Sequence, residues 1–300
     1  MGGTLIRPDV IHCGNLDMLY IAYNYKQFID PTVKLVYEIA DLPKVIYNSN
    51  KTLKSLILKA IFCSIERVLC KQILLLVITS PYFWDDYYSA FVPKEKVLFL
   101  PNVPELSLFS QYNKEPHDSF VIGFIGRIRY PKQIRMLIDA SNGIEGVKIL
   151  IAGSGPSYEE IRDYCIGKEH VLFFGPYDYH KDIVALYSKI DCVYAVYDTT
   201  YDNVRIALPN RLYEAIACEL PIIVADNTAL ARFVVEKGIG FVVSDRDTVG
   251  LRSLMLRLIS QPQLLYEVKV RLRELKPLYS AETGFNMLRE SYKRLSVPSR

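Results

Sequence analysis

The sequence lacks the features that mark several large classes of protein. No two of its six cysteines form a C-x-x-C pair, and no histidine stands at metal-ligand spacing, so neither a zinc site nor a disulfide scaffold is indicated. The longest apolar run, around residues 73–79, is far shorter than the about 18 residues that a membrane-spanning helix needs. An excess of one charge is missing too, because 36 basic and 33 acidic residues give a net charge of +3. This balance argues against a nucleic-acid-binding protein.

What is present is a large apolar fraction. Half of the 300 residues are apolar and 23% are charged, which excludes disorder and allows two domains with sizeable cores. The N-terminus shows no basic-then-apolar signal pattern, and scattered cysteines are typical of reduced thiols. We therefore expect a cytoplasmic protein, soluble or held peripherally at the inner face of a membrane.

From residue 118 onward, short β-branched runs alternate with helical patterns, which predicts parallel βαβ units. The expected strands are 120–125, 147–152, 171–174, 192–196, 221–225 and 240–243. Several are almost continuously apolar, as strands covered by helices on both faces must be. Residues 118–280 are therefore predicted to form a doubly wound α/β domain.

Residues 1–104 repeat this pattern with fewer strands. We expect strands at 9–13, 33–37, 74–79 and 96–100, and helices at 15–29 and 50–72. The polar, proline-bearing stretch that follows has no periodicity, so residues 105–117 are predicted to be a linker. The last segment, 281–300, is predicted to be a helix that packs back on the first domain.

The predicted helix at 50–72 combines basic and apolar side chains. Lys51, Lys54, Lys59, Arg67 and Lys71 accompany Leu53, Leu56, Ile57, Ala60, Ile61 and Ile65. Such a helix can lie on an anionic membrane surface. It can also be a surface helix that packs its apolar stripe on the sheet, and the general expectation for amphipathic helices favours this second interpretation.

Two cations follow the first strand of the second domain. Arg127 comes directly after the strand, and Lys132 opens the next helix behind Pro131. Free amides and the helix dipole make a helix N-terminus an anion site, to which Arg127 and Lys132 would add charge for a diphosphate. Taken alone, both side chains are equally well explained as solvated surface groups.

A carboxylate lies on the early turns of another predicted helix. Pro209 and Asn210 start this helix, which places Glu214 one turn further on. A buried carboxylate at this point can accept hydrogen bonds from both hydroxyls of a ribose. A favourable interaction with the helix dipole explains the position of Glu214 equally well.

These segments together carry a family resemblance. Their order is GFIGR at 123–127, Lys132, VKILIAGSGP at 147–156, FFGPY at 173–177 and PNRLYEAIACELPIIVAD at 209–226. This order resembles the donor-binding domain of retaining glycosyltransferases of family 4, which have the GT-B fold, and the likeness runs through most of residues 118–260. In the first domain, PDVIHCGN, VYEIADLP and FLPNVPE are similar to family segments in family order.

The resemblance implies a fold and a set of site residues. The fold would be GT-B, with two Rossmann-like doubly wound domains facing a cleft, the first incomplete. Arg127 and Lys132 would bind the donor diphosphate, and Glu214 the ribose. The remaining donor contacts would be Gly175, Pro176 and Tyr177 at the nucleobase, and Leu208 and Asn210 within the loop 206–210 at the diphosphate and sugar. Asp41 is a candidate for a catalytic contact on the acceptor side. His12, which ends a predicted strand near the expected cleft, is a second candidate, although a lone histidine more often has a structural role.

The implied reaction is of the hexosyltransferase type. A UDP- or GDP-linked sugar would pass to a glycan or lipid-linked acceptor with retention, in the synthesis of a surface polysaccharide. The nucleotide sugar is a substrate, and no cofactor is implied. The leaving diphosphate would help to deprotonate the acceptor, so catalysis would rest on positioning and on stabilising the departing charge.

Three departures from the family pattern keep an alternative open. Ile206 stands where an acid often precedes Glu214 by eight residues, and Ala40 stands where a histidine usually precedes Asp41. The opening strands and the glycine-rich loop of the family's first domain have no counterpart, which would leave the strand 9–13 at an unpaired edge unless a partner completes the sheet. The alternative is a non-catalytic nucleotide-binding remnant or a partner-dependent subunit of a split enzyme.

Two other sequence patterns bear on the kind of site. Asp245-Arg246-Asp247 matches the D-x-D metal motif of other glycosyltransferases, but its place before a periodic helix favours capping. A dinucleotide oxidoreductase would need a glycine fingerprint followed by an acid about 20 residues later, and the sequence has none. No metal site is therefore predicted.

Overall fold

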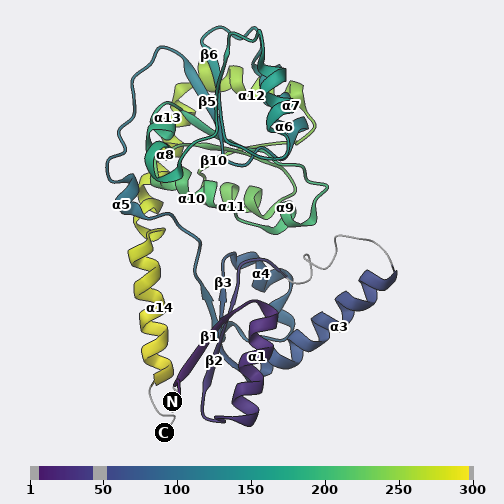
Figure 1. Cartoon of the computed structure of the whole chain (residues 1–300). Helices are drawn as coiled ribbons and strands as arrows, with labels where there is room; N and C mark the ends of the chain where they lie inside the picture. Colours follow the sequence, from purple (N-terminus) through teal and green to yellow (C-terminus); the bar gives the residue numbers. More distant parts are fainter. Residues whose placement is uncertain (1–6, 43–52, 297–300) are drawn as a thin grey trace, which may run out of the picture. The chain divides into compact units, whose positions relative to one another are not determined.

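The computed structural model describes residues 7–42 and 53–296, which fall into two compact units (Figure 1). The first unit comprises residues 1–102 and 284–300, and the second comprises 103–283. Each unit holds one parallel sheet with helices packed on it. The expected α/β class with two parallel sheets is confirmed.

The sheet of the first unit has the order β1-β2-β3-β4, and all of its pairings are parallel. Its strands are β1 (Val10–Gly14), β2 (Lys34–Ile39), β3 (Ile73–Ile78) and β4 (Val97–Phe99). The helices are α1 (Asn15–Phe28), α3 (Leu53–Leu69), α4 (Pro81–Asp86) and α14 (Ala281–Ser296), with single 3-10 turns at Cys70–Gln72, Tyr88–Ala90 and Lys94–Lys96. Among the described residues β1 pairs only with β2 and is thus an edge strand.

One face of this first sheet is covered by the C-terminal helix. Leu288, Tyr292 and Leu295 of α14 pack on Val36, Leu75, Val77 and Leu98 of the sheet. The chain thus returns to its first unit after the second unit is complete. Burial of these apolar side chains, rather than helix propensity, is what stabilises α14 there.

The second unit contains a six-stranded parallel sheet of order β10-β9-β8-β5-β6-β7. Its strands are β5 (Phe120–Ile125), β6 (Val147–Ala152), β7 (Val171–Gly175), β8 (Cys192–Ala195), β9 (Ile222–Ala225) and β10 (Gly240–Val243). Its helices are α5 (Leu106–Phe109), α6 (Pro131–Ser141), α7 (Tyr158–Cys165), α8 (Tyr179–Ser188), α9 (Asp202–Ile206), α10 (Asn210–Ala217), α11 (Ala229–Lys237), α12 (Thr248–Ser260) and α13 (Pro262–Leu275), followed by a 3-10 turn at Lys276–Leu278. The strand order reverses between β5 and β8. In open parallel sheets, ligands bind beyond the carboxyl ends of the strands at such a reversal.

The predicted linker is part of the second unit. Residues 105–117 begin with the short helix α5, and Glu115 donates its backbone N–H to the carbonyl of Ser188 at 2.9 Å. Lys114 forms an ion pair with Asp191 at 3.2 Å. The segment was expected to be irregular because its sequence has no periodicity, but tertiary hydrogen bonds of this kind leave no periodic signal.

The expectation that α3 packs its apolar stripe on the sheet is wrong. Leu53, Leu56, Ile57, Ile61 and Ile65 are between 37% and 74% exposed, whereas Glu66 is fully buried. The physical reason is that Glu66 receives hydrogen bonds from the hydroxyls of Tyr37, Tyr87 and Tyr88 inside the unit. Because these hydrogen bonds hold Glu66 inside the unit, the apolar side chains on the opposite side of α3 face outward.

No helix in the described ranges has both the length and the apolar character to cross a bilayer.

Candidate functional site

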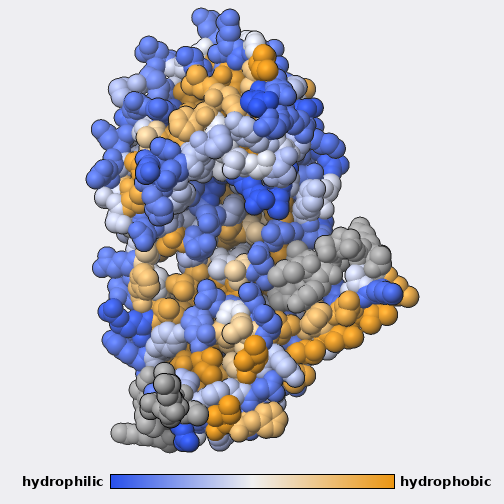
Figure 2. All heavy atoms as spheres, in the orientation of Figure 1, coloured by the Kyte–Doolittle hydropathy of each residue, from blue (hydrophilic) through white to orange (hydrophobic). Residues whose placement is uncertain are grey.

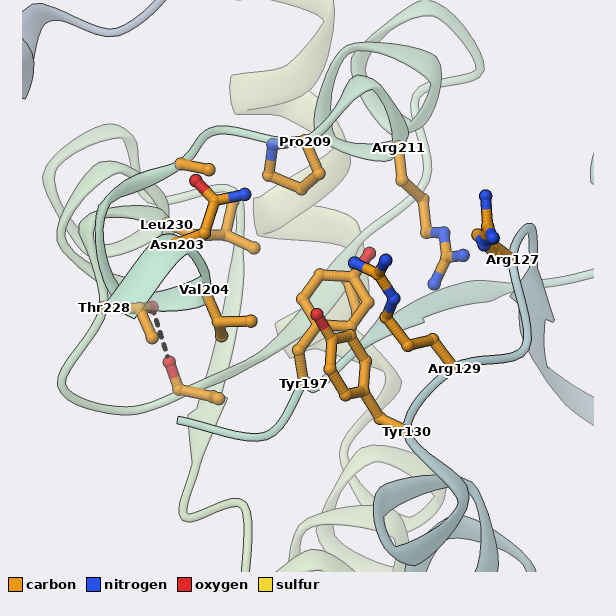
Figure 3. A pocket seen from close by; sticks show the side chains of 13 residues that line it. Arg127, Arg129, Tyr130, Tyr197, Asn203, Val204, Pro209, Arg211, Thr228 and Leu230 are labelled. Atoms are coloured by element: carbon orange, nitrogen blue, oxygen red, sulfur yellow. Dashed lines mark hydrogen bonds between the residues drawn. The ribbon is translucent and has the colours of Figure 1, made fainter. Parts of the chain in front are cut away.

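A cavity of about 220 Å³ opens at the carboxyl ends of β5, β8 and β9 in the second unit. We call it the arginine pocket and define it by Arg127, Arg129, Tyr130, Tyr197, Asn203 and Arg211, which line it. The three arginine side chains gather on one side of this pocket (Figure 3). The ring of Tyr130 lies against that of Tyr197, with centroids 5.7 Å apart. The pocket therefore combines concentrated positive charge with an aromatic wall, at the strand reversal.

Arg211 is the unusual member of this group, because it is only 7% exposed. Its Nη1 donates to the carbonyl of Tyr194 at 3.2 Å, and its guanidinium lies 4.4 Å from the ring centre of Phe124 and 5.4 Å from that of Tyr197. Within the described part of the chain it makes no ion pair with a carboxylate. A buried charge without a counter-charge is costly, so an anionic ligand in the pocket would be stabilised strongly.

Glycines at the ends of β5 and β6 allow this arrangement. A Cβ on Gly126 would lie closer than 3.0 Å to Nη2 of Arg211, and the φ of +135° is itself unfavourable for any other residue. A Cβ on Gly153, with φ +148°, would collide with the backbone carbonyl of Gly126. Glycine is thus required at both positions for the two loops and the guanidinium to approach.

A second cavity of about 470 Å³ lies at the ends of β5, β6 and β7. We call it the glycine–tyrosine pocket, lined by Gly126, Arg127, Gly153, Ser154, Gly155, Tyr177 and Tyr179. Arg127 also lines the arginine pocket, so the exposed side chain of this one residue borders both cavities. Together the two cavities lie on both sides of the strand reversal, where the fold predicts a ligand.

Glu214 lies behind the glycine–tyrosine pocket. It is 7% exposed, and its carboxylate accepts hydrogen bonds from Tyr179 at 2.9 Å and from Tyr187 at 2.7 Å. Burial, reinforced by the charge of Glu214, raises the pKa of Tyr179 above its ordinary range, so this hydroxyl stays protonated and donates. Tyr179 lines the pocket, whereas Glu214 does not. In this structure Glu214 therefore affects the cavity by holding the hydroxyl of Tyr179 in a hydrogen bond.

Lys132 does not line either pocket with Arg127. It is exposed at the second position of α6 and lines a third cavity, of about 530 Å³, with Gln133, Asp198, Asp245 and Arg246. The structure instead places Arg129 and Arg211 beside Arg127. Neither arginine is among the site residues predicted from the sequence, although Arg129 lies two residues after Arg127 and Arg211 directly follows Asn210.

The other expected donor contacts take different positions. Tyr177 lines the glycine–tyrosine pocket, while Gly175 ends β7 and accepts a hydrogen bond from the N–H of Gly153 at 2.7 Å. Pro176 connects Gly175 to Tyr177. Leu208 is buried and Asn210 is exposed at the start of α10, whereas their neighbours Ala207 and Pro209 line the arginine pocket. The loop 206–210 therefore reaches the pocket through alternate residues.

The two acceptor-side candidates lie in the first unit. Asp41 is exposed just beyond β2. His12 lies in the middle of β1 rather than at its end, and its ring contacts Glu38 at 2.9 Å and the hydroxyl of Tyr292 at 2.6 Å. The hydrogen bond from His12 lowers the pKa of Glu38. His12 therefore joins β1 to α14, and the catalytic roles of both residues stay predictions.

The D-x-D motif caps a helix. Oδ1 of Asp247 accepts the N–H of Gly250 at 2.8 Å at the start of α12. Asp245 is buried and accepts hydrogen bonds from the backbone and the hydroxyl of Thr199. Across the described residues no group of three or more His, Cys, Asp or Glu side chains is arranged to hold a metal ion.

The fold and one family match relate this chain to a known class of protein. Solved glycosyltransferase structures are similar in fold to this chain, in which two α/β units each hold one parallel sheet. Residues 119–261 match the family model described as glycosyl transferases group 1.

Similar proteins are found by sequence and by structure. The chain is 26% identical over 266 residues to the succinoglycan biosynthesis protein ExoL of Rhizobium meliloti (strain 1021), covering 84% of this chain and 64% of ExoL. It is similar in fold to sucrose-phosphate synthase from Thermosynechococcus elongatus, with a TM-score of 0.71, 19% identity and coverage of 97% and 74% of the two chains. HepE of Anabaena in complex with UDP gives a TM-score of 0.72, 16% identity and coverage of 95% and 79%. At these identities the structures establish the likeness of fold.

Proposed function

We propose that the chain transfers a sugar from a UDP- or GDP-linked donor to a glycan or lipid-linked acceptor, with retention, during synthesis of a surface polysaccharide. The observation that carries the proposal is the buried, unneutralised guanidinium of Arg211 beside Arg127 and Arg129 at the strand reversal. ExoL is named for succinoglycan biosynthesis, and HepE has been crystallised with UDP and with UDP-glucose, which supports a nucleotide-sugar donor.

In this proposal the arginine pocket holds the donor diphosphate. A guanidinium presents a planar fork of N–H donors that matches phosphate oxygens, and a charged hydrogen bond contributes about 1.5–3 kcal/mol. As the sugar–phosphate bond breaks, negative charge grows on the departing diphosphate. We propose that Arg127, Arg129 and Arg211, which line this pocket, stabilise that charge and that no cofactor takes part.

The glycine–tyrosine pocket is the place that we propose for the nucleoside. Tyr177 and Tyr179 supply aromatic surface, and the glycine backbones of the loops after β5 and β6 permit a base or ribose to approach closely. Each oxygen of Glu214 accepts one tyrosine hydroxyl in the structure and has a free lone pair for a ribose hydroxyl. On the acceptor side Asp41 stays the predicted contact, and the acceptor is proposed from the family.

Calorimetric titration tests the donor site. UDP, GDP and uridine are titrated into the chain and into Arg127→Ala, a substitution of an exposed side chain. We expect Arg127→Ala to weaken the binding of the diphosphate about ten-fold to a hundred-fold, as the loss of one charged hydrogen bond predicts, and to leave uridine binding almost unchanged. Equal losses for diphosphate and nucleoside would contradict the assignment.

A matched control is Arg246→Ala, since Arg246 is also exposed and lies at the same edge of the sheet but lines the third cavity. Its UDP affinity should equal that of the unmodified chain. Transfer itself is tested with radiolabelled nucleotide sugars and a membrane glycolipid fraction, and NMR of the product reports the anomeric configuration. A folded chain that binds UDP but transfers none of the sugars offered would favour the non-catalytic alternative.

A further inference from the structure

Helix α3 of the first unit exposes an apolar face. Its inner face is mixed, because the half-buried or buried side chains are those of Ser55, Lys59, Phe62, Cys63, Glu66 and Leu69. The opposite face carries an apolar stripe at intervals of four, four, four and three residues, formed by Leu53, Ile57, Ile61, Ile65 and Val68. A helix that only covers a sheet has the opposite distribution. The apolar face therefore needs a different explanation.

The apolar surface on α3 is large and prominent. Members of the stripe are 37% to 74% exposed, and Leu56 and Leu58 beside it are 49% and 51% exposed. Figure 2 shows hydrophobic colour running along this helix. The adjoining helix α1 contacts α3 and adds Ile21 and Phe28, at 59% and 83% exposure. Exposed apolar surface of this kind on a folded unit marks an interaction site.

On α3 and the turn that follows it, the exposed charges all have one sign. Lys54, Arg67 and Lys71 are exposed, whereas the acid of α3, Glu66, is buried and bonded to three tyrosines. Lys54 and Lys71 form no ion pair with any acid in the described residues. The stripe thus has a basic, unneutralised border, which is complementary to an anionic surface rather than to a second copy of the same helix.

We propose that α3 lies in the surface of a membrane that contains anionic lipid. The stripe enters the boundary between headgroups and acyl chains, and Lys54 and Lys71 meet lipid phosphates. This geometry is that of an interfacial helix, which carries bulky apolar residues on one face and lysine or arginine at its border. The contact concerns the first unit alone and does not depend on the donor site.

Vesicle flotation of the full chain tests this proposal. Vesicles of phosphatidylcholine alone are compared with vesicles that contain about one third phosphatidylglycerol. We expect binding to the anionic vesicles to be more than ten-fold tighter, since each basic side chain near the surface contributes roughly five-fold, and to weaken as salt is raised. Equal binding to both kinds of vesicle, or to neither, would overturn the proposal.

Two pairs of variants test whether vesicle binding depends on the stripe and its basic border, rather than on the overall hydrophobicity and charge of the chain. Ile57→Ser with Ile61→Ser should reduce vesicle binding more than ten-fold, while Ile166→Ser with Val249→Ser, which alters two exposed apolar side chains of the second unit, should leave it unchanged. Lys54→Gln with Lys71→Gln should remove most of the preference for anionic lipid, and Lys148→Gln with Lys237→Gln should not. Circular dichroism confirms that each variant is folded.

Light scattering of the same variants distinguishes a protein occupant. A dimer that dissociates in the Ile57→Ser, Ile61→Ser variant, together with no binding to vesicles, would show that the stripe holds a second copy and would overturn the membrane assignment. A monomer that floats with anionic vesicles in a stripe-dependent manner supports it.

Discussion

Buried carboxylates in the two units are held by tyrosine hydroxyls. Glu66 accepts from Tyr37, Tyr88 and Tyr87 at 2.9, 2.6 and 2.8 Å, and Glu214 accepts from Tyr179 and Tyr187. Burial raises the pKa of Glu66, and the three hydroxyls oppose that rise only in part. A hydroxyl cage of this kind satisfies hydrogen bonds but provides no positive charge. Ionisation of Glu66 is therefore less favourable in the folded unit than in water.

The first prediction concerns the pH dependence of stability. Because the pKa of Glu66 is raised in the folded state, its contribution to stability is fully present below the ordinary value of 4.5 and is lost as the pH rises through the folded value. We expect Glu66→Gln to be least stable relative to the unmodified chain near pH 4 and to lose part of this disadvantage toward pH 8.

Trp84, the single tryptophan, lies in α4 of the first unit, so its fluorescence during urea unfolding reports on the unit that contains Glu66. Glu95→Gln, at an exposed position of the same unit, is the control and should leave the pH profile unchanged. A difference between Glu66→Gln and the unmodified chain that is the same at every pH would contradict the prediction.

The second prediction concerns Gly126, where backbone and side chain are both constrained. Gly126→Ala would add a methyl group against Nη2 of Arg211 at a φ of +135°. We expect a loss of about 1–3 kcal/mol in stability from backbone strain, and weaker UDP binding because the guanidinium is displaced. Thermal unfolding followed by circular dichroism and calorimetry with UDP measure the two effects.

Gly143→Ala is the matched control for this substitution. Gly143 also has a positive φ, +68°, but a Cβ there would meet no atom within 4 Å. The control should lose about 1–2 kcal/mol of stability and keep its UDP affinity. If both variants bind UDP equally well, Gly126 has no special role in positioning Arg211.

The candidate site was predictable only in part, for reasons that lie in individual side chains. Arg127 and Tyr177 follow their strands directly, so strand ends alone bring them to the edge of the sheet. Arg211 reaches the same place from α10, by crossing the rings of Phe124 and Tyr197 toward Gly126. Such a path depends on tertiary packing, and no local pattern in the sequence indicates it.

At the scale of elements, the strands of the second unit were the most predictable feature. β5, β6 and β10 have the predicted bounds, since buried parallel strands must be almost continuously apolar and glycine or polar residues end them. The apolar pattern of α3 was equally clear, but it shows only that one face is apolar. Which face turns inward was decided by Glu66 and its tyrosine partners.

The third prediction concerns the attachment of α14 to the first sheet. Leu288 packs against the buried face formed by Val36, Leu75, Val77 and Leu98, whereas Phe285 on the same helix is 68% exposed. Because Leu288 is half-buried, we expect Leu288→Ala to reduce the stability of the first unit by about 1–2 kcal/mol and Phe285→Ala to have little effect. Urea unfolding followed by Trp84 fluorescence measures both variants; equal stability would show that α14 does not support the sheet.

At the scale of the whole molecule, donor and acceptor candidates are divided between the two units. The arginine pocket and the glycine–tyrosine pocket are lined by residues of 103–283 alone, and Asp41 and His12 belong to the first unit. The second unit also has its own core, in which side chains of β5, β6, β8 and β9 pack with those of α6 and α12. Nucleotide recognition is therefore expected to be a property of one unit, and sugar transfer a property of both.

The fourth prediction follows from this division. A fragment of residues 103–283 should fold and bind UDP with the affinity of the whole chain, because it retains Arg127, Arg129, Arg211 and the core beneath them. The same fragment should transfer no sugar, since the acceptor side is absent. Calorimetry of fragment and whole chain measures the affinities, and Arg127→Ala in the fragment should lower its affinity by the same factor as in the whole chain. A folded fragment that binds UDP more than ten-fold more weakly would show that the first unit takes part in holding the nucleotide.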